Sequence, residues 1–223
     1  MNNDALIATI TEAVIREIKQ RGGQLAKPAA PLQRRGIPVG ISNRHLHLSE
    51  ADAAMLFGAG NCLTSWKDLS QPGQFACHEK VIIVGPKGAI EGVRVLGPTR
   101  NKTQVEISGS DAVRLGIKPP VRDSGDLAGS AGLTLVGPAG TVVLKEGTII
   151  AARHVHMHPD DAARFGVVDR QRISVRSGGL RGVIFQEVLV RVHPQFALDM
   201  HVDIDEANAA GLSNGDMVEM IQL

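Results

Sequence analysis

The sequence predicts a mainly β fold with short helices, built largely from one small repeated unit. Glycine is abundant, with 25 residues among 223, and valine and isoleucine recur between frequent turn signals. The segments VIIVGPKGAIEGVRVLGP and LTLVGPAGTVVLKEG share the pattern V-G-P-x-G between two apolar runs. Proline fixes φ at the second turn position and glycine gives an unstrained exit, so both segments are predicted to be hairpins. No P-loop or G-x-G-x-x-G motif supports a nucleotide-binding fold.

Charge and cysteine content narrow the class of protein. The formal net charge is +1, so no electrostatic feature argues for nucleic acid or an anionic membrane as a partner. No apolar run is long enough to span a bilayer, and no signal-peptide pattern opens the sequence. Cys62 and Cys77 lack C-x-x-C spacing and are expected to be thiols. We therefore expect a soluble intracellular protein; the sequence leaves its oligomeric state open, a homo-oligomer included.

Residues 1–22 are predicted to form an amphipathic helix. Leu6, Ile10, Val14 and Ile18 recur every four residues, and Gly22 can end the helix. Residues 23–35 are rich in alanine, proline and basic residues without periodicity, which is typical of a linker. The helix could pack on its own domain or dock in an apolar groove of a partner, and the linker favours the second interpretation.

The most informative pattern is a strand–helix unit that occurs four times. RHLHLSEADAAMLFG from Arg44 and RHVHMHPDDAARFG from Arg153 agree in order and spacing. TQVEISGSDAVRLG from Thr103 and MHVDIDEANAAG from Met200 fit the same frame more weakly. Each unit combines a short alternating strand, a residue of the helix-capping type and about two helical turns closed by glycine.

Two columns of this alignment hold the polar residues of the four strands. Apolar residues stand between them, as in a strand with one buried face. Side chains two residues apart lie about 6.6 Å apart along that face, so each H-x-H pair can bind one metal or face a shared one. The second column holds His45, Gln104, His154 and His201, and the fourth holds His47, Glu106, His156 and Asp203.

The sixth column bears on a third histidine. His158 aligns there with Ser49, Ser108 and Asp205, all favourable N-cap residues before a helix. His158 is therefore predicted to begin a helix and is the least favoured metal ligand. Glu50 falls in the first helical turn, where an acidic residue complements the helix dipole.

The remaining polar residues suggest two metal sites. Zinc accepts imidazole and carboxylate ligands, and catalytic zinc sites commonly use three protein ligands with one open position. Two half-open sites are favoured over one structural site. Gln104 and Asp203 are candidates for residues that contact and orient the metal ligands. Arg100 is either a solvated arginine or a clamp for an oxyanion beside the metals. The six candidate ligands are His45, His47, Glu106, His154, His156 and His201.

Four motifs in order carry a resemblance to a known family. GISNRHLHLSEADAAMLFG, QVEISGSDAVRLGI, RHVHMHPDDAARFGV and MHVDIDEANAAGL together resemble the PduL-type phosphate propanoyltransferases of bacterial microcompartments, over about residues 36–223. The resemblance implies two closed β-barrel domains, one discontinuous: residues 36–43 with 152–223, and residues 44–151. Residues 1–35 resemble the encapsulation peptides of such cargo enzymes. They imply contact with a shell or with co-encapsulated enzymes in the microcompartment lumen.

The resemblance also implies a reaction and a set of site residues. Propanoyl-CoA and phosphate would give propanoyl phosphate and coenzyme A at two zinc ions, which recycles the coenzyme. His45, His47 and Glu106 match the ligands of one metal, and His154, His156 and His201 match those of the other. Arg100 matches the phosphate-binding arginine, with Ser124 beside it. The positions that match the coenzyme site are Ser42, Lys67, Arg94, Leu96 and Asn208.

Two other functions would use the same candidate ligands. A zinc-dependent hydrolase or cupin-like metalloenzyme would deliver water in place of phosphate. A non-catalytic metal-binding cargo or scaffold protein would use the same ligands without turnover. The sequence leaves open the acyl-chain preference, and whether the compartment processes propanediol, fucose-type sugars or another substrate.

Overall fold

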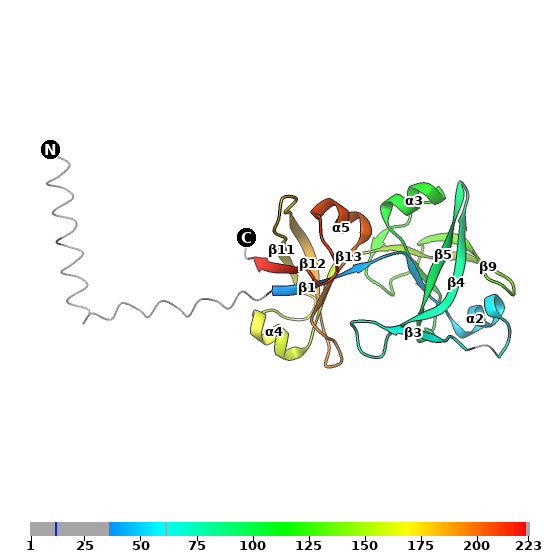
Figure 1. Cartoon of the computed structure of the whole chain (residues 1–223), viewed down its shortest axis with the longest axis horizontal. Coiled ribbons are helices and arrows are strands. Elements are labelled where there is room, and N and C mark those ends of the chain that lie inside the picture. The colour runs from blue at the N-terminus through cyan, green and yellow to red at the C-terminus, as the bar shows by residue number, and fades with distance from the viewer. Residues whose placement is uncertain (1–11, 13–35, 61, 222–223) are drawn as a thin grey trace. The chain divides into compact units, whose positions relative to one another are not determined.

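The computed structural model describes residue 12, residues 36–60 and residues 62–221 (Figure 1). The predicted helix over 1–22 and the linker over 23–35 therefore lie outside the described residues, apart from Glu12, which is helical and exposed. The rest confirms a mainly β fold with short helices and two closed barrels of six strands each. Among the described helices, none combines the length and the apolar character that crossing a bilayer requires.

The first barrel joins one strand from the start of the described chain to five from its end. The ring runs β1-β13-β10-β12-β11-β14 and closes where β14 pairs with β1. The pairs β1–β13 and β10–β12 are parallel, and the other four pairs of the ring are antiparallel. The strands are β1 (Gly36–Ser42), β10 (His154–Met157), β11 (Arg172–Arg176), β12 (Ile184–Val192), β13 (Asp199–Asp203) and β14 (Met217–Ile221).

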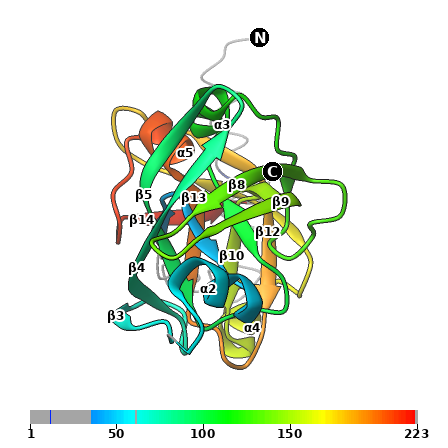
Figure 2. The ribbon, with the colours of Figure 1, turned by 90° about the vertical axis from the view of Figure 1, so that its right-hand side faces the viewer.

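The second barrel uses the strands between them and faces the viewer in Figure 2. Its ring runs β2-β5-β4-β8-β9-β6, and β6 pairs again with β2. Strands β3 and β7 extend it by pairing with β4 and β9. The strands are β2 (His45–His47), β3 (Ser65–Asp68), β4 (Phe75–Gly85), β5 (Gly88–Gly97), β6 (Gln104–Glu106), β7 (Val121–Arg122), β8 (Ala131–Val136) and β9 (Thr141–Ala151).

Contacts group residues 36–223 into one compact unit. The predicted division of this part of the chain into two domains therefore stays a prediction. Contacts between the barrels come from helices and loops: Asp205 Oδ2 accepts from the Ser110 N–H at 2.7 Å, and Arg170 lies 3.6 Å from Asp123.

Both predicted V-G-P-x-G hairpins are confirmed, and each one caps a helix. The first joins β4 to β5 and the second joins β8 to β9. The N–H of Lys87 donates to the Leu115 carbonyl at 3.0 Å, and that of Ala139 donates to the Leu56 carbonyl at 2.9 Å. A Cβ on Gly85 or Gly137 would lie 2.4 Å from the same carbonyl oxygens. The two turn glycines therefore let a hairpin satisfy the exposed carbonyl at the end of a helix.

The four repeats form four short helices, two on each barrel (Figure 1). Ser49, Ser108 and His158 cap the first three, as the alignment predicts. The prediction for the fourth is wrong: its cap is Asp203, not Asp205, because the fourth unit enters its helix two residues earlier. Asp205 instead caps the helix of the neighbouring barrel through Ser110. The helices are α2 (Glu50–Phe57), α3 (Gly109–Leu115), α4 (Pro159–Phe165) and α5 (Ile204–Ala210).

Strand alternation separates the cores of the barrels from their polar faces. Leu46, Val105 and Val155 are fully buried and Val202 is nearly so; each stands between the two polar columns of its strand. The first two belong to the core of the second barrel and the others to the core of the first. Because successive side chains on a strand point to opposite faces, the histidines beside these residues point out of the barrels.

Candidate active site between the barrels

The first cluster lies on two paired strands of the second barrel. Strand β2 supplies His45 and His47, and the antiparallel β6 sets Glu106 directly opposite His45. His45 Nε2 lies 3.4 Å from Glu106 Oε2. One ligand atom from each of the three residues falls within 4.8 Å of the others, a spacing that a single metal ion can bridge.

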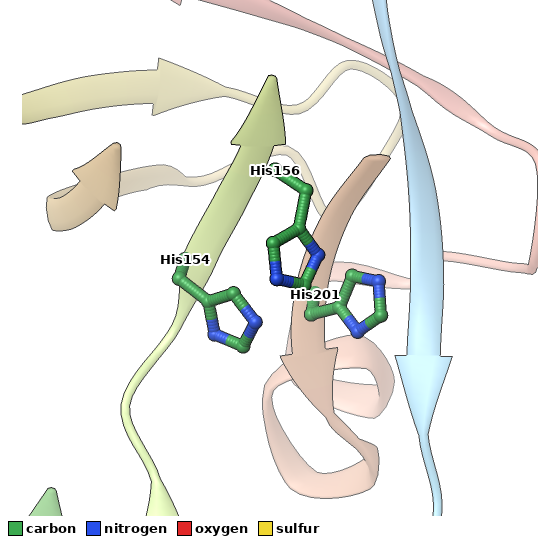
Figure 3. A group of neighbouring side chains, drawn as sticks. All are labelled: His154, His156 and His201. Atoms are coloured by element: carbon green, nitrogen blue, oxygen red, sulfur yellow. The ribbon is translucent and has the colours of Figure 1, made fainter. Parts of the chain in front are cut away.

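The second cluster repeats this geometry in the first barrel (Figure 3). Strand β10 supplies His154 and His156, and β13 sets His201 opposite His154. The imidazole centroids lie 4.7 Å (His154–His156), 5.1 Å (His154–His201) and 5.0 Å (His156–His201) apart. The ligand atoms again fall within 4.8 Å of one another. Figure 3 shows the rings of His156 and His201 from two strands turned toward one another.

The first histidine of each H-x-H pair makes the same hydrogen bond. Nδ1 of His45 lies 2.8 Å from the Asn43 carbonyl, and Nδ1 of His154 lies 2.8 Å from the Ala152 carbonyl. A carbonyl only accepts, so Nδ1 is the donor in both rings, and in the neutral form of the ring the lone pair lies on Nε2. A backbone carbonyl commonly fixes the tautomer of a metal-binding histidine in this way.

The second histidine of each pair has a buried nitrogen without a partner. Nδ1 of His47 and Nδ1 of His156 are buried and make no hydrogen bond. Leaving such a group unpaired costs about 1–3 kcal/mol. Two unpaired imidazole nitrogens at equivalent positions, each among nitrogen and oxygen donors, fit the chemistry of a bound divalent cation such as zinc.

Burial keeps three of these imidazoles neutral, those of His47, His154 and His156. Desolvation, followed by the neighbouring histidines, lowers the pKa of His156 to about 2 and that of His154 to about 4. Desolvation, followed by His45 and Arg100, lowers the pKa of His47 to about 3. Burial alone would raise the pKa of Glu106, but the neighbouring histidines and Arg100 lower it below its ordinary value. Near pH 7, His47, His154 and His156 are therefore neutral and Glu106 is a carboxylate, the protonation states that metal binding needs.

Glu106 is held by a network that leads to Arg100. Gln104 donates from Nε2 to Glu106 Oε1, and to Ser124 Oγ at 2.8 Å, while its Oε1 accepts from the Gly125 N–H at 2.8 Å. Ser124 Oγ donates to Glu106 Oε1 at 3.1 Å, and Arg100 Nη1 donates to Ser124 Oγ at 3.2 Å. The predicted phosphate residues Arg100 and Ser124 therefore contact each other beside the first cluster. Of the two candidate ligand partners, Gln104 contacts a cluster residue, whereas Asp203 caps α5.

Both clusters face one cleft of about 1010 Å³. Charges of Glu106 and His154 influence each other's pKa, so the clusters are electrostatic neighbours across it. The lining includes twelve of the thirteen matched site positions. Asn208 is exposed on α5 and is not among the lining residues. The matched positions in the lining are Ser42, His45, His47, Lys67, Arg94, Leu96, Arg100, Glu106, Ser124, His154, His156 and His201.

Two of the positions matched to the coenzyme lie beside the first cluster. In the parallel pair β2–β5, Arg94 stands opposite His45 and Leu96 stands opposite His47. The Arg94 guanidinium lies 4.2 Å from the ring centroid of Trp66, whose side chain is exposed at the cleft. Such a cation–π pair gives the cleft a broad cationic and aromatic surface next to Lys67.

Several residues of the cleft were missed by the sequence reasoning. Asp199 is buried, and its Oδ2 lies 3.1 Å from His201 Nε2. It stands two residues before His201 on the same strand, so the period of two could have revealed it. A Cβ on Gly40 would lie 2.8 Å from the same oxygen, so glycine there leaves room for this carboxylate. Arg191, opposite His156 in β12, and Phe196 carry no repeat signal.

Comparisons with known proteins identify the family of the chain. The family model for phosphate propanoyltransferase matches residues 38–213. A phosphate propanoyltransferase of Thermotoga maritima is 53% identical over 215 residues, covering 96% of this chain and 99% of that protein. One from Priestia megaterium is 50% identical, covering 97% and 95%, and one from Rhodobacter capsulatus is 52% identical, covering 82% and 86%. The chain therefore belongs to the phosphate propanoyltransferase family.

Proposed function

We propose that this transferase moves a propanoyl or similar acyl group from coenzyme A to inorganic phosphate, at a site with two zinc ions. The observation that carries the proposal is the pair of three-ligand clusters facing one cleft, with Arg100 and Ser124 beside them. Membership of the family supports acyl-CoA and phosphate as the substrates.

His45, His47 and Glu106 would hold one zinc ion, and His154, His156 and His201 the other. Their donor sets and the unpaired nitrogens of His47 and His156 support this assignment. When bound, zinc supplies Lewis acidity toward a carbonyl oxygen and lowers the pKa of a thiol.

Arg100 and Ser124 would bind the phosphate. A guanidinium matches two phosphate oxygens in a planar, two-pronged geometry, and the nearby Ser124 hydroxyl can orient a third. Burial lowers the pKa of Arg100, yet guanidinium groups stay charged in proteins, so the cation persists. Held in this way, a phosphate oxygen attacks the thioester carbonyl carbon; a C–O bond forms, the C–S bond breaks, and coenzyme A leaves with the electron pair of the C–S bond on sulfur.

Direct transfer is favoured over an acyl-enzyme. Cys77 is buried outside the cleft lining, and burial raises the pKa of its thiol to about 11. Ser124 does face the cleft, but its carboxylate neighbour Glu106 has a lowered pKa and is a weak base. Neither residue has the activated partner that a covalent nucleophile needs.

The activity is tested by incubating purified, zinc-loaded protein with propanoyl-CoA, with and without phosphate. We expect release of thiol and formation of propanoyl phosphate only when phosphate is present. Thiol release that is independent of phosphate would refute the transferase proposal and identify a hydrolase. Removal of metal by a chelator should abolish turnover, and zinc should restore it.

We further propose that residues 1–22 direct the chain to the lumen of a bacterial microcompartment, where the reaction recycles coenzyme A. The four-residue spacing of apolar side chains in this segment and the linker after it support the proposal. Deletion of residues 1–20 should leave turnover intact and abolish co-purification with shells. Loss of the folded enzyme on deletion would contradict it.

A further inference from the structure

A buried glutamine joins the two barrels at the edge of the cleft. Gln71, in the turn between β3 and β4, is 3% exposed. Its Nε2 donates to the Ala197 carbonyl at 3.0 Å, and the Ala197 N–H donates to its Oε1 at 3.3 Å. The amide thus pairs with the backbone of Ala197 in both directions, as a neighbouring strand would. Nothing in the proposed chemistry accounts for this contact.

The contact fixes the segment that carries Phe196. Ala197 lies between Phe196 and Leu198, and both of these neighbours line the cleft. The Phe196 ring centroid lies 4.4 Å from that of His156, and the Phe196 N–H donates to the His193 carbonyl at 3.0 Å. Gln71 therefore anchors a short loop of the first barrel to the second barrel and holds an aromatic ring against the second histidine cluster.

The cleft is lined by both polar and apolar side chains, and this ring is one of the apolar ones. Leu198 adjoins it in the chain, and Leu69, two residues before Gln71, also lines the cleft. Arg100 and Ser124, beside the first cluster, are polar, and a phosphate is expected there. Lys67, Arg94 and the exposed Trp66 offer a charged and aromatic surface for the coenzyme. The apolar part is left for the alkyl chain of the substrate.

We propose that Phe196, held in place by Gln71, is the wall that receives the acyl chain and limits it to a few carbons. This inference rests on the proposed function, because it assumes an acyl-CoA whose carbonyl lies between the two clusters. An aromatic ring packed on His156 leaves room for a propanoyl chain and obstructs a longer one. Phe196 is then a specificity residue, and Gln71 is a positioning residue that acts through the Ala197 backbone.

The test compares kcat/KM for propanoyl-CoA and hexanoyl-CoA in zinc-loaded enzyme. Phe196→Ala should raise the hexanoyl-to-propanoyl ratio by about 10-fold or more, because each methylene in an apolar pocket changes kcat/KM by about that factor. Phe196→Leu should raise it less. Gln71→Leu should shift the ratio in the same direction, mainly through KM for the acyl-CoA, since it loosens the wall and leaves the reacting groups in place.

Asp205→Asn provides the matched control. It weakens another contact between the barrels, the one with Ser110, and should leave the ratio at the wild-type value. Metal content and circular dichroism report whether each variant is folded. Folded, active Phe196 variants with a wild-type ratio would overturn the inference, as would equal loss of turnover on both substrates in Phe196→Ala and Phe196→Leu. A wild-type enzyme without phosphate-dependent turnover would refute the proposed function instead.

Discussion

Replacement of Gln104 by leucine tests how the first cluster is organised. Gln104 is 1% exposed and makes three hydrogen bonds, to Glu106, Ser124 and Gly125. Leucine fills a similar volume but can make none of them. The Gly125 N–H then loses its acceptor, which costs about 1–3 kcal/mol, and the carboxylate of Glu106 loses a charge-assisted bond of about 1.5–3 kcal/mol.

Two separate effects follow from this loss. The free energy of unfolding of the metal-free protein should fall by about 3 kcal/mol, because part of the loss is offset by the apolar side chain. Zinc affinity of the site at His45, His47 and Glu106 should fall by about 10- to 100-fold, the usual effect of removing a partner that orients a ligand. The other zinc site should keep its affinity, since the hydrogen bonds of Gln104 go to Glu106, Ser124 and Gly125.

Competition with a chromophoric chelator measures the two zinc affinities, and urea titration of metal-free protein measures stability. Gln71→Leu is the matched control, because it removes an equally buried glutamine whose bonds go to Ala197. That control should lower stability and leave the zinc affinity of the site at His45, His47 and Glu106 unchanged. Two unchanged zinc affinities in Gln104→Leu would refute the idea that this network orients Glu106.

Three further outcomes are expected. Arg100→Ala should raise KM for phosphate and lower kcat/KM by about 100-fold or more while both zinc ions stay bound, as phosphate-dependence assays and metal analysis would show; wild-type KM would contradict its role. His158→Ala should cost about 1 kcal/mol in thermal or urea unfolding without loss of zinc, because its Nδ1 accepts from the Asp160 N–H as a helix cap; loss of a zinc ion would make it a ligand. In metal-free protein, the three buried imidazoles have pKa values below the ordinary 6.5, so the unfolded chain binds more protons below that pH. The free energy of unfolding should therefore fall between pH 6.5 and 4, by up to about 1.4 kcal/mol per pH unit for each ring, and a flat urea-midpoint profile would contradict the burial argument.

The repeat explains why much of the fold could be predicted from the sequence. Alternation in the strands identifies the buried residues, and turn chemistry identifies the hairpins, because both depend on neighbours within a few positions. The same frame predicts His158 as a cap. It fails at Asp205, since the fourth unit is too short for the alignment to register where its helix begins.

Residues that act across the cleft could not be predicted in this way. Phe196 and Gln71 stand far apart in the sequence, in loops without periodicity, and only the packing of the two barrels brings them together. Arg191 reaches the cleft because β12 runs parallel to β10. The roles of the six clustered residues as zinc ligands, and of Arg100 and Ser124 as phosphate ligands, stay predictions that the assays above address.

The pairing of β1 affects the order in which the chain can fold during synthesis. Val39 pairs with Met200, and Ile37 pairs with Val218, so the first strand to leave the ribosome waits for partners near the far end of the chain. At usual elongation speeds this delay is roughly ten to thirty seconds. All the strands of the other barrel, from β2 to β9, emerge in the meantime. The second barrel can therefore close early. It then keeps the two ends of the first barrel close together until the ring of the first barrel is complete.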